Sequence, residues 1–214
     1  MRVRRDTMVA GIAVLLSSCG PDRAPAQTVD EAIAASRAII EAYLADSPTP
    51  GLSIAVHLAD SLVWAEGFGL ASVELDVPVT TETKFRIGSI SKSLTSAAVG
   101  LLVERGLLEL DAPVQTYVPD FPEKTHPITT RQLAGHQSGI PHYGPEDFQN
   151  FEPYDGVFHA LDKFKDRELL FEPGERFEYS SFGFNLVSAV VQCASGRQFV
   201  DFMHDEVFEP LGMP

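Results

Sequence analysis

Two spacings of hydrophobic residues along the chain predict its first elements. Between Thr28 and Pro48 apolar side chains recur on one helical face, and Thr28 and Glu31 have the spacing of a capping box, so we expect a helix there. The segments LSIAVHL (52–58) and LVWAEGFGLA (62–71) are rich in residues that favour strands. Three residues separate them, which predicts an antiparallel hairpin. We expect a further strand in TKFRIG (83–88).

From Ser89 onward the pattern is mostly helical. It predicts helices in 89–105, ending at Gly106, and in 181–195, ending at Gly196, because glycine is common just after a helix. Shorter helical pieces are expected in LDAPVQTYV, in ITTRQLAGH with its capping threonines, and around Phe199, Phe202, Met203 and Val207. Residues 140–155 are rich in Pro, Gly and Tyr and predict a surface loop of the kind that often borders a binding site.

Composition narrows the class of protein. The chain has 214 residues, 44% of them hydrophobic and 21% charged, which is ordinary for a soluble globular domain. Its formal net charge is −14, and the 16 basic residues are scattered along the chain. Nucleic-acid binding needs clustered Lys and Arg, so we expect no nucleic-acid partner.

The N-terminus has the pattern of an export signal. Basic residues precede the apolar run MVAGIAVLL, and LSSC follows, which is similar to a bacterial lipoprotein signal. We expect residues 1–18 to be a signal peptide, Cys19 to be lipidated, residues 19–28 to be a tether and 29–214 to fold. Ordinary signal cleavage is the alternative. In the lipidated form the protein would be exported to the periplasm or cell surface and anchored to the membrane through Cys19, and Cys193 would remain as a buried, inert thiol.

Lys92 is the candidate for chemistry. It is the only formally charged residue from Ile87 to Val103, and Ser89 precedes it by three positions, one helical turn away. A serine hydroxyl needs a base to become a nucleophile. Burial and the positive end of a helix both disfavour an ammonium, so Lys92 could serve as that base. Alternatively, Ser89 caps the helix and Lys92 extends its amine to water.

Four segments in order resemble one superfamily. This superfamily is that of the serine β-lactamases and penicillin-binding proteins. Its nucleophile segment resembles FRIGSISKSLT, and its His-x-Ser-Gly turn resembles TTRQLAGHQSGIPHY. Its second motif resembles FEPGERFEYSSFGFNLVSAVV, and the segment after that motif resembles FEPLGMP. The resemblance is closest to the class C-like branch, which includes esterases and D-amino-acid peptidases. It implies an α+β fold of the β-lactamase/transpeptidase type, an antiparallel sheet with a helical subdomain.

The resemblance also implies roles. Ser89 would form an acyl-enzyme, Lys92 would activate it, and Tyr179 would carry the proton to the leaving group. Ser181 stands where most class C-like members have Asn and would bind substrate with a shorter reach, which favours small esters, amides or D-amino-acid peptides over β-lactams. In the family's turn His136 is structural. We expect no cofactor and, with neither His-Glu-x-x-His nor Cys-x-x-Cys spacing, no metal site.

The family's third motif, a Lys/His-Thr/Ser-Gly strand, does not occur after Tyr179 in this sequence. We therefore expect residues 29–214 to be the N-terminal portion of the hydrolase domain, without its C-terminal sheet strands. The backbone of that strand supplies one oxyanion donor, so the chain alone is expected to turn over slowly. The alternatives are a non-catalytic penicillin-binding-like lipoprotein that binds cell-wall peptide or a partner, and an inactive fragment of the enzyme.

Overall fold

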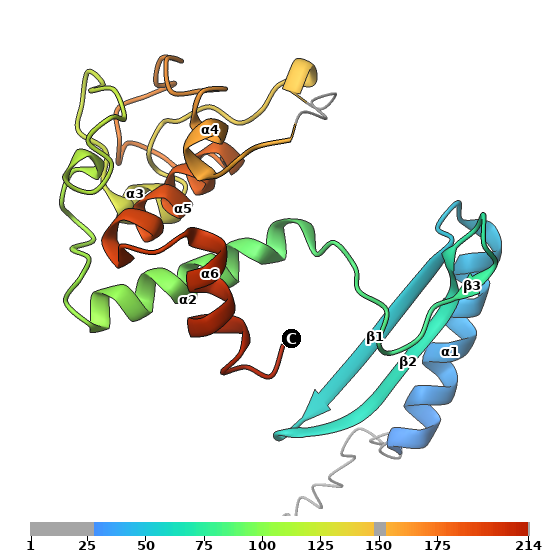
Figure 1. Ribbon diagram of the computed structural model, residues 1–214. Coiled ribbons are helices and arrows are strands. Elements are labelled where there is room, and N and C mark those ends of the chain that lie inside the picture. Colours follow the sequence, from blue (N-terminus) through green and yellow to red (C-terminus); the bar gives the residue numbers. More distant parts are fainter. Residues whose placement is uncertain (1–27, 148–152, 214) are drawn as a thin grey trace, which may run out of the picture. The chain divides into compact units, whose positions relative to one another are not determined.

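The computed structural model describes residues 28–147 and 153–213 (Figure 1). These described residues divide into two compact units, with the boundary between Phe85 and Arg86. The predicted signal peptide, the lipidation site Cys19 and the tether up to residue 27 lie outside the described residues. The assignment of 29–214 to a single domain stays a prediction. In the described part of the chain, no helix is both long and apolar enough to cross a membrane.

The first unit combines one helix with a small antiparallel sheet. Helix α1 (Val29–Asp46) begins at the predicted capping box, in which the Thr28 hydroxyl accepts from the Glu31 N–H. Strands β1 (Gly51–Leu58), β2 (Ser61–Ser72) and β3 (Val77–Pro78) follow in the order β1-β2-β3. The predicted helix and hairpin are thus confirmed.

The hairpin turns on two residues with left-handed backbone. Ala59 and Asp60 have φ of 44° and 64°, and Leu58 pairs directly with Ser61. A two-residue turn of this hand matches the twist of the flanking strands. Glu66 on β2 accepts hydrogen bonds from Arg37 of α1 and from Trp64, both at 2.7 Å, and so links the helix to the sheet.

The predicted strand TKFRIG is wrong. Residues 83–87 have no regular secondary structure, and Gly88 begins a 3-10 turn. The segment spans the boundary between the units, and none of the described strands pairs with it. A strand needs a neighbour for its backbone groups, and here the short β3 is the partner that pairs with β2, at Leu70 and Ser72.

The second unit is helical. Its elements are the 3-10 turn η1 (Gly88–Ile90), α2 (Ser91–Glu104), η2 (Val114–Thr116), α3 (Thr130–Ala134), η3 (Pro145–Asp147), α4 (Val157–Leu161), α5 (Ser181–Ser195), α6 (Phe199–Met203) and a π-helical turn η4 (His204–Phe208). These elements confirm the predicted helices. They also place Ser89 in the 3-10 turn before α2, whereas the pattern predicted an α-helix from that residue.

Helix α5 forms the centre of this unit (Figure 1). Eight of its residues are buried, and it packs against α2, α3, α4 and α6. It ends as predicted at Gly196, whose φ of 67° suits glycine. Helix α2 buries one face only, through Thr95, Ala98, Val99 and Leu102.

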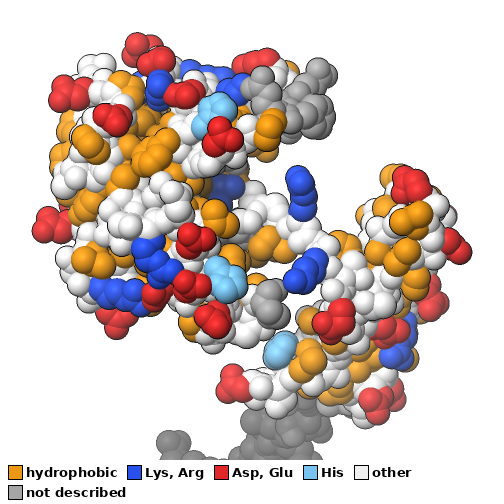
Figure 2. Space-filling model, viewed as in Figure 1, with side chains coloured by type: hydrophobic (Ala, Val, Ile, Leu, Met, Phe, Trp, Pro, Cys, Tyr) orange, Lys and Arg blue, Asp and Glu red, His pale blue; other side chains and the backbone are white. Residues whose placement is uncertain are grey.

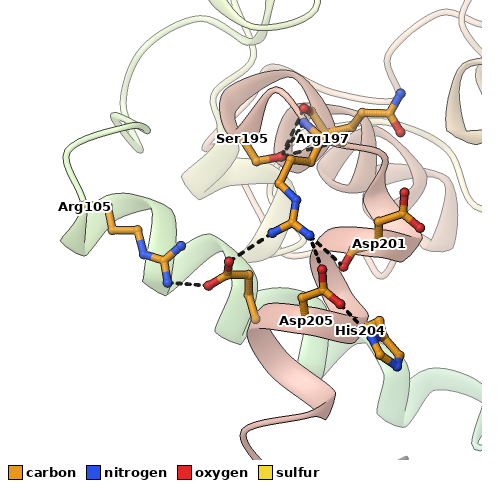
Figure 3. Close-up of polar contacts among 8 residues, drawn as sticks. Arg105, Ser195, Arg197, Asp201, His204 and Asp205 are labelled. Carbon is orange, nitrogen blue, oxygen red and sulfur yellow. Dashed lines mark hydrogen bonds and ion pairs between the residues drawn. The ribbon is translucent and has the colours of Figure 1, made fainter.

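Ion pairs connect the end of α2 to the turn after α6 (Figure 3). The Glu206 carboxylate accepts from Arg105 at 2.6 Å and from Arg197 at 3.0 Å. Arg197 also pairs with Asp205, which bonds to the His204 ring at 2.7 Å. These side chains are partly exposed, so the network orients the C-terminal turn more than it stabilises the unit.

The distribution of charged side chains agrees with the expectation from the sequence, whereas the burial of the free cysteine agrees only in part. On the face drawn in Figure 2, acidic and basic side chains are interspersed over the second unit. Cys193 is half-buried against the core, whereas the sequence predicted full burial. Burial raises the pKa of its thiol, which favours the unreactive protonated form.

Candidate active site

Ser89 and Lys92 lie one turn apart at the start of α2. Ser89 is exposed in the turn η1, next to Gly88, whose φ of 52° is easily adopted only by glycine. Lys92 is half-buried, and its Nζ donates to Ser89 Oγ at 3.2 Å. The spacing predicted this contact, and the structure has it.

Tyr179 brings a third group to the same point. It lies 90 residues after Ser89, in the segment that leads into α5. Its Oη and Ser89 Oγ share a hydrogen bond of 2.7 Å. Lys92 Nζ lies 5.0 Å from the centre of the Tyr179 ring and 5.7 Å from that of Phe184. The serine hydroxyl therefore has one potential proton acceptor, Tyr179 Oη, and one donor, Lys92 Nζ, within hydrogen-bonding distance.

The surroundings of Tyr179 favour its ionised form. Hydrogen bonding from Lys92, and then from Ser89, lowers the pKa of Tyr179 below its usual range, and Ser181 contributes less. A cation beside a phenol stabilises the phenolate. A phenolate at 2.7 Å from Ser89 Oγ is placed to take the serine proton. Ser181, the predicted substrate-binding residue, is the first residue of α5 and lies beside this phenol.

His136 holds the backbone on both sides of Tyr179. Its carbonyl oxygen accepts from the Glu178 N–H at 2.8 Å, and its Nδ1 accepts from the Ser180 N–H at 3.2 Å. The imidazole also packs on the Tyr179 ring, with centres 4.5 Å apart. Burial, and then the charge of Lys92, lowers the pKa of His136, so the ring is a neutral acceptor. This geometry agrees with the structural role that the resemblance implied.

His142 and Pro141 make a second attachment to the same segment. His142 Nδ1 accepts from the Ser181 N–H at 3.1 Å, and the Pro141 carbonyl accepts from Ser180 Oγ at 3.0 Å. Ser180 is 1% exposed and also caps α5 by accepting from the Gly183 N–H. The first residues of the predicted loop 140–155 thus border the candidate site, as expected.

Sequence reasoning missed His142 and the buried cap Ser180. A histidine two residues after Ile140, in a loop already expected to border a site, was the available signal for His142. Ser180 directly precedes an apolar helical run, which is the usual position of a capping serine.

A possible metal-binding cluster lies elsewhere in the second unit. His204, Asp205 and Glu209 each offer a ligand atom, and these atoms lie within 4.8 Å of one another. All three side chains are exposed, and His204 and Asp205 already bond to each other. Arg197 pairs with the same Asp205 carboxylate and would oppose a cation there, so the cluster is a poor metal site (Figure 3).

Comparison with known proteins identifies the relatives of this chain. The family profile described as Beta-lactamase matches residues 37–214. The mitochondrial serine beta-lactamase-like protein of Homo sapiens is 33% identical over 85% of this chain and 46% of its own length. A D-aminopeptidase of Gluconobacter oxydans is 31% identical over 82% of this chain and 34% of its own length.

Solved structures agree with these sequences. The octameric penicillin-binding protein homologue from Pyrococcus abyssi superposes with a TM-score of 0.77 and 33% identity, over 85% of this chain and 43% of that one. The chain thus spans less than half the length of these relatives. Their fold is the α+β fold of β-lactamases and transpeptidases, with a small antiparallel sheet and helices, as the sequence predicted. The chain belongs to the beta-lactamase family of serine hydrolases.

Proposed function

We propose that Ser89 is the nucleophile of a serine hydrolase that works through an acyl-enzyme. One observation carries the proposal: Ser89 Oγ lies 2.7 Å from Tyr179 Oη and 3.2 Å from Lys92 Nζ. Acyl transfer needs a nucleophile, a group that can take the proton of that nucleophile, and a cation that stabilises this group in its basic form.

The reaction proceeds in two halves. Ser89 Oγ bonds to the acyl carbon of the substrate while its proton passes to the Tyr179 phenolate. Tyr179 then gives the proton to the leaving alcohol or amine as the bond to that group breaks. In the second half water attacks the ester on Ser89, its proton passes to Tyr179 and then to Ser89 Oγ, and the acid is released. Lys92 lowers the pKa of Tyr179 and so stabilises the phenolate at the start of each half.

We propose small esters, amides or D-amino-acid peptides as substrates. The D-aminopeptidase from Gluconobacter oxydans among the relatives supports this class. Ser181, which stands beside Tyr179 at the start of α5, has a shorter side chain than asparagine and cannot offer both an amide donor and an amide acceptor. A site with this residue favours substrates that need fewer side-chain hydrogen bonds than a β-lactam.

We propose that the protein is exported and anchored to a membrane by a lipid on Cys19. The support is the sequence of residues 1–19 alone, with its basic residues, apolar run and small residues before the cysteine. Metabolic labelling with a radioactive fatty acid tests this proposal, because label should enter the protein and disappear in a Cys19→Ala variant. Equal labelling of the two would refute it.

Burst kinetics with p-nitrophenyl acetate test the catalytic proposal. A burst of about one p-nitrophenol per chain is expected even when turnover is slow, because acylation releases the phenol first. Ser89→Ala should abolish the burst, and Ser93→Ala, an exposed serine of the same helix, should keep it. An unchanged burst in Ser89→Ala would refute the proposal. Binding of a D-alanyl peptide without any burst would instead favour the non-catalytic lipoprotein.

A further inference from the structure

Two imidazoles hold two consecutive backbone N–H groups beside the candidate nucleophile. His136 Nδ1 accepts from the Ser180 N–H at 3.2 Å, and His142 Nδ1 accepts from the Ser181 N–H at 3.1 Å. Ser180 is the N-cap of α5 and Ser181 its first residue. The segment that carries Tyr179 is therefore fixed to the 136–143 loop through ring nitrogens that must lack a proton.

These two hydrogen bonds determine the tautomer of both imidazoles. A neutral imidazole has one acceptor and one donor nitrogen, so acceptance at Nδ1 leaves the proton on Nε2. Protonation converts Nδ1 into a donor, which faces the Ser181 N–H and cannot bond to it. A second positive charge would then also stand at the N-terminus of α5, where the helix dipole is unfavourable to cations.

His142 differs from His136 in what remains after protonation. The His136 carbonyl still accepts from the Glu178 N–H, whatever the charge of its ring. His142 contacts Ser181 through the ring alone, because the neighbouring bond from Ser180 ends on Pro141. The His142 bond is therefore the contact that pH can remove without loss of the backbone bonds around it.

Groups from three elements face His142. Lys92 approaches from α2, His136 and Tyr143 from its own loop, and Tyr179 from the segment before α5. Burial, and then the charge of Lys92, lowers the pKa of His142 below its usual range. Ionisation of Tyr179 would favour a proton on His142, whereas the charge of Lys92 opposes it.

We propose that His142 is a pH-sensitive positioning residue: its neutral imidazole holds the Ser181 N–H, and protonation releases the start of α5 and thereby moves Tyr179 away from Ser89. The effect on the rate of acylation rests on the proposed function, whereas the hydrogen bond and its loss do not. His142 touches no reacting atom in this scheme and acts through Ser181 and Tyr179.

Three variants separate this role from general packing. His142→Asn places an amide oxygen near the position of Nδ1, which keeps an acceptor that does not titrate. His142→Phe keeps an aromatic ring and removes the acceptor. His159→Asn is the matched control, because His159 is exposed on α4 and has no place in the site.

The first measurement is the amide resonance of Ser181 as a function of pH. In the wild type and in His159→Asn it should shift as the pH falls below about 6.5, the usual value for histidine. In His142→Asn the shift should be smaller, because only the titration of His136, which bonds to the neighbouring Ser180 N–H, is left. A Ser181 resonance that ignores pH in the wild type, or titrates equally in His142→Asn, would overturn the proposal.

The second measurement is the rate at which a fluorophosphonate modifies Ser89. If the reaction needs ionised Tyr179, the logarithm of the labelling rate rises with pH with a slope of about one. Each further positioning group that must lose a proton adds about one to this slope at acid pH. His142→Asn should lower the acid slope by about one, and His142→Phe should react about 10-fold more slowly at pH 8, with the Asn variant restoring most of the rate. Wild-type slopes in both variants would overturn the proposal. If Ser89 does not react at any pH, the proposed function fails, and the Ser181 titration still decides the role of His142.

Discussion

Replacing Tyr179 by phenylalanine removes one oxygen atom from the site and keeps the aromatic ring. The lost oxygen is the one 2.7 Å from Ser89 Oγ. The ring contacts with His136 and Lys92 need no hydroxyl, so the backbone around residue 179 should stay in place. The variant therefore tests proton transfer with little change in packing.

The expected loss follows from what the hydroxyl does. A positioned general acid or base contributes about 10²- to 10⁴-fold to a reaction rate, so fluorophosphonate labelling of Ser89 should slow by that factor. Tyr179 is 36% exposed, and surface substitutions without a buried partner change stability by no more than about 0.5 kcal/mol. The melting temperature should stay almost constant.

Tyr117→Phe is the matched control, because its hydroxyl accepts from the Glu109 N–H at 2.6 Å, away from Ser89. We expect a loss of about 1 kcal/mol in the free energy of unfolding and no change in labelling. Labelling of Tyr179→Phe within about threefold of the wild type would refute the reasoning, since it is far below the contribution of a general base.

Three further predictions test the environment of the site and the core. Lys92→Met should raise the pKa of Tyr179 back towards its usual range, because Lys92 is the largest cause of its lowering. The absorbance of the phenolate at 295 nm should therefore appear at higher pH than in the wild type. In each case the signal of Tyr179 is obtained by subtracting the spectrum of the same protein with Tyr179→Phe. Leu186→Ala should lower the free energy of unfolding in urea by about 2–5 kcal/mol, because Leu186 is 0% exposed in α5, whereas the exposed Leu170→Ala should cost much less. Glu206→Gln should lower that free energy only slightly, and the loss should shrink in high salt, because the pairs with Arg105 and Arg197 are partly exposed.

Local signals predicted most of the elements. The capping boxes at Thr28 and Thr129 and the left-handed glycine at Gly196 fix helix ends through groups close in sequence. The hairpin likewise depends on a two-residue turn between two strand-forming segments. The strand predicted in TKFRIG was wrong because a strand depends on a partner strand, and the pattern of one segment does not show which segments lie beside it in space.

The candidate site was predictable in two different ways. The contact of Ser89 with Lys92 follows from helical spacing, although the serine lies in a 3-10 turn. The contact with Tyr179, 90 residues away, was expected from the family resemblance only, because no periodicity connects positions so far apart. His142 was missed because its role depends on how an irregular loop folds against the start of α5.

The location of a covalent adduct tests the central claim most directly. The purified chain is incubated with a fluorophosphonate, and its intact mass and its peptides are measured. The account predicts one adduct per chain, located on Ser89, lost in Ser89→Ala and retained in Ser93→Ala. An adduct on another residue, or an adduct that persists in Ser89→Ala, would contradict the assignment of Ser89 as the nucleophile.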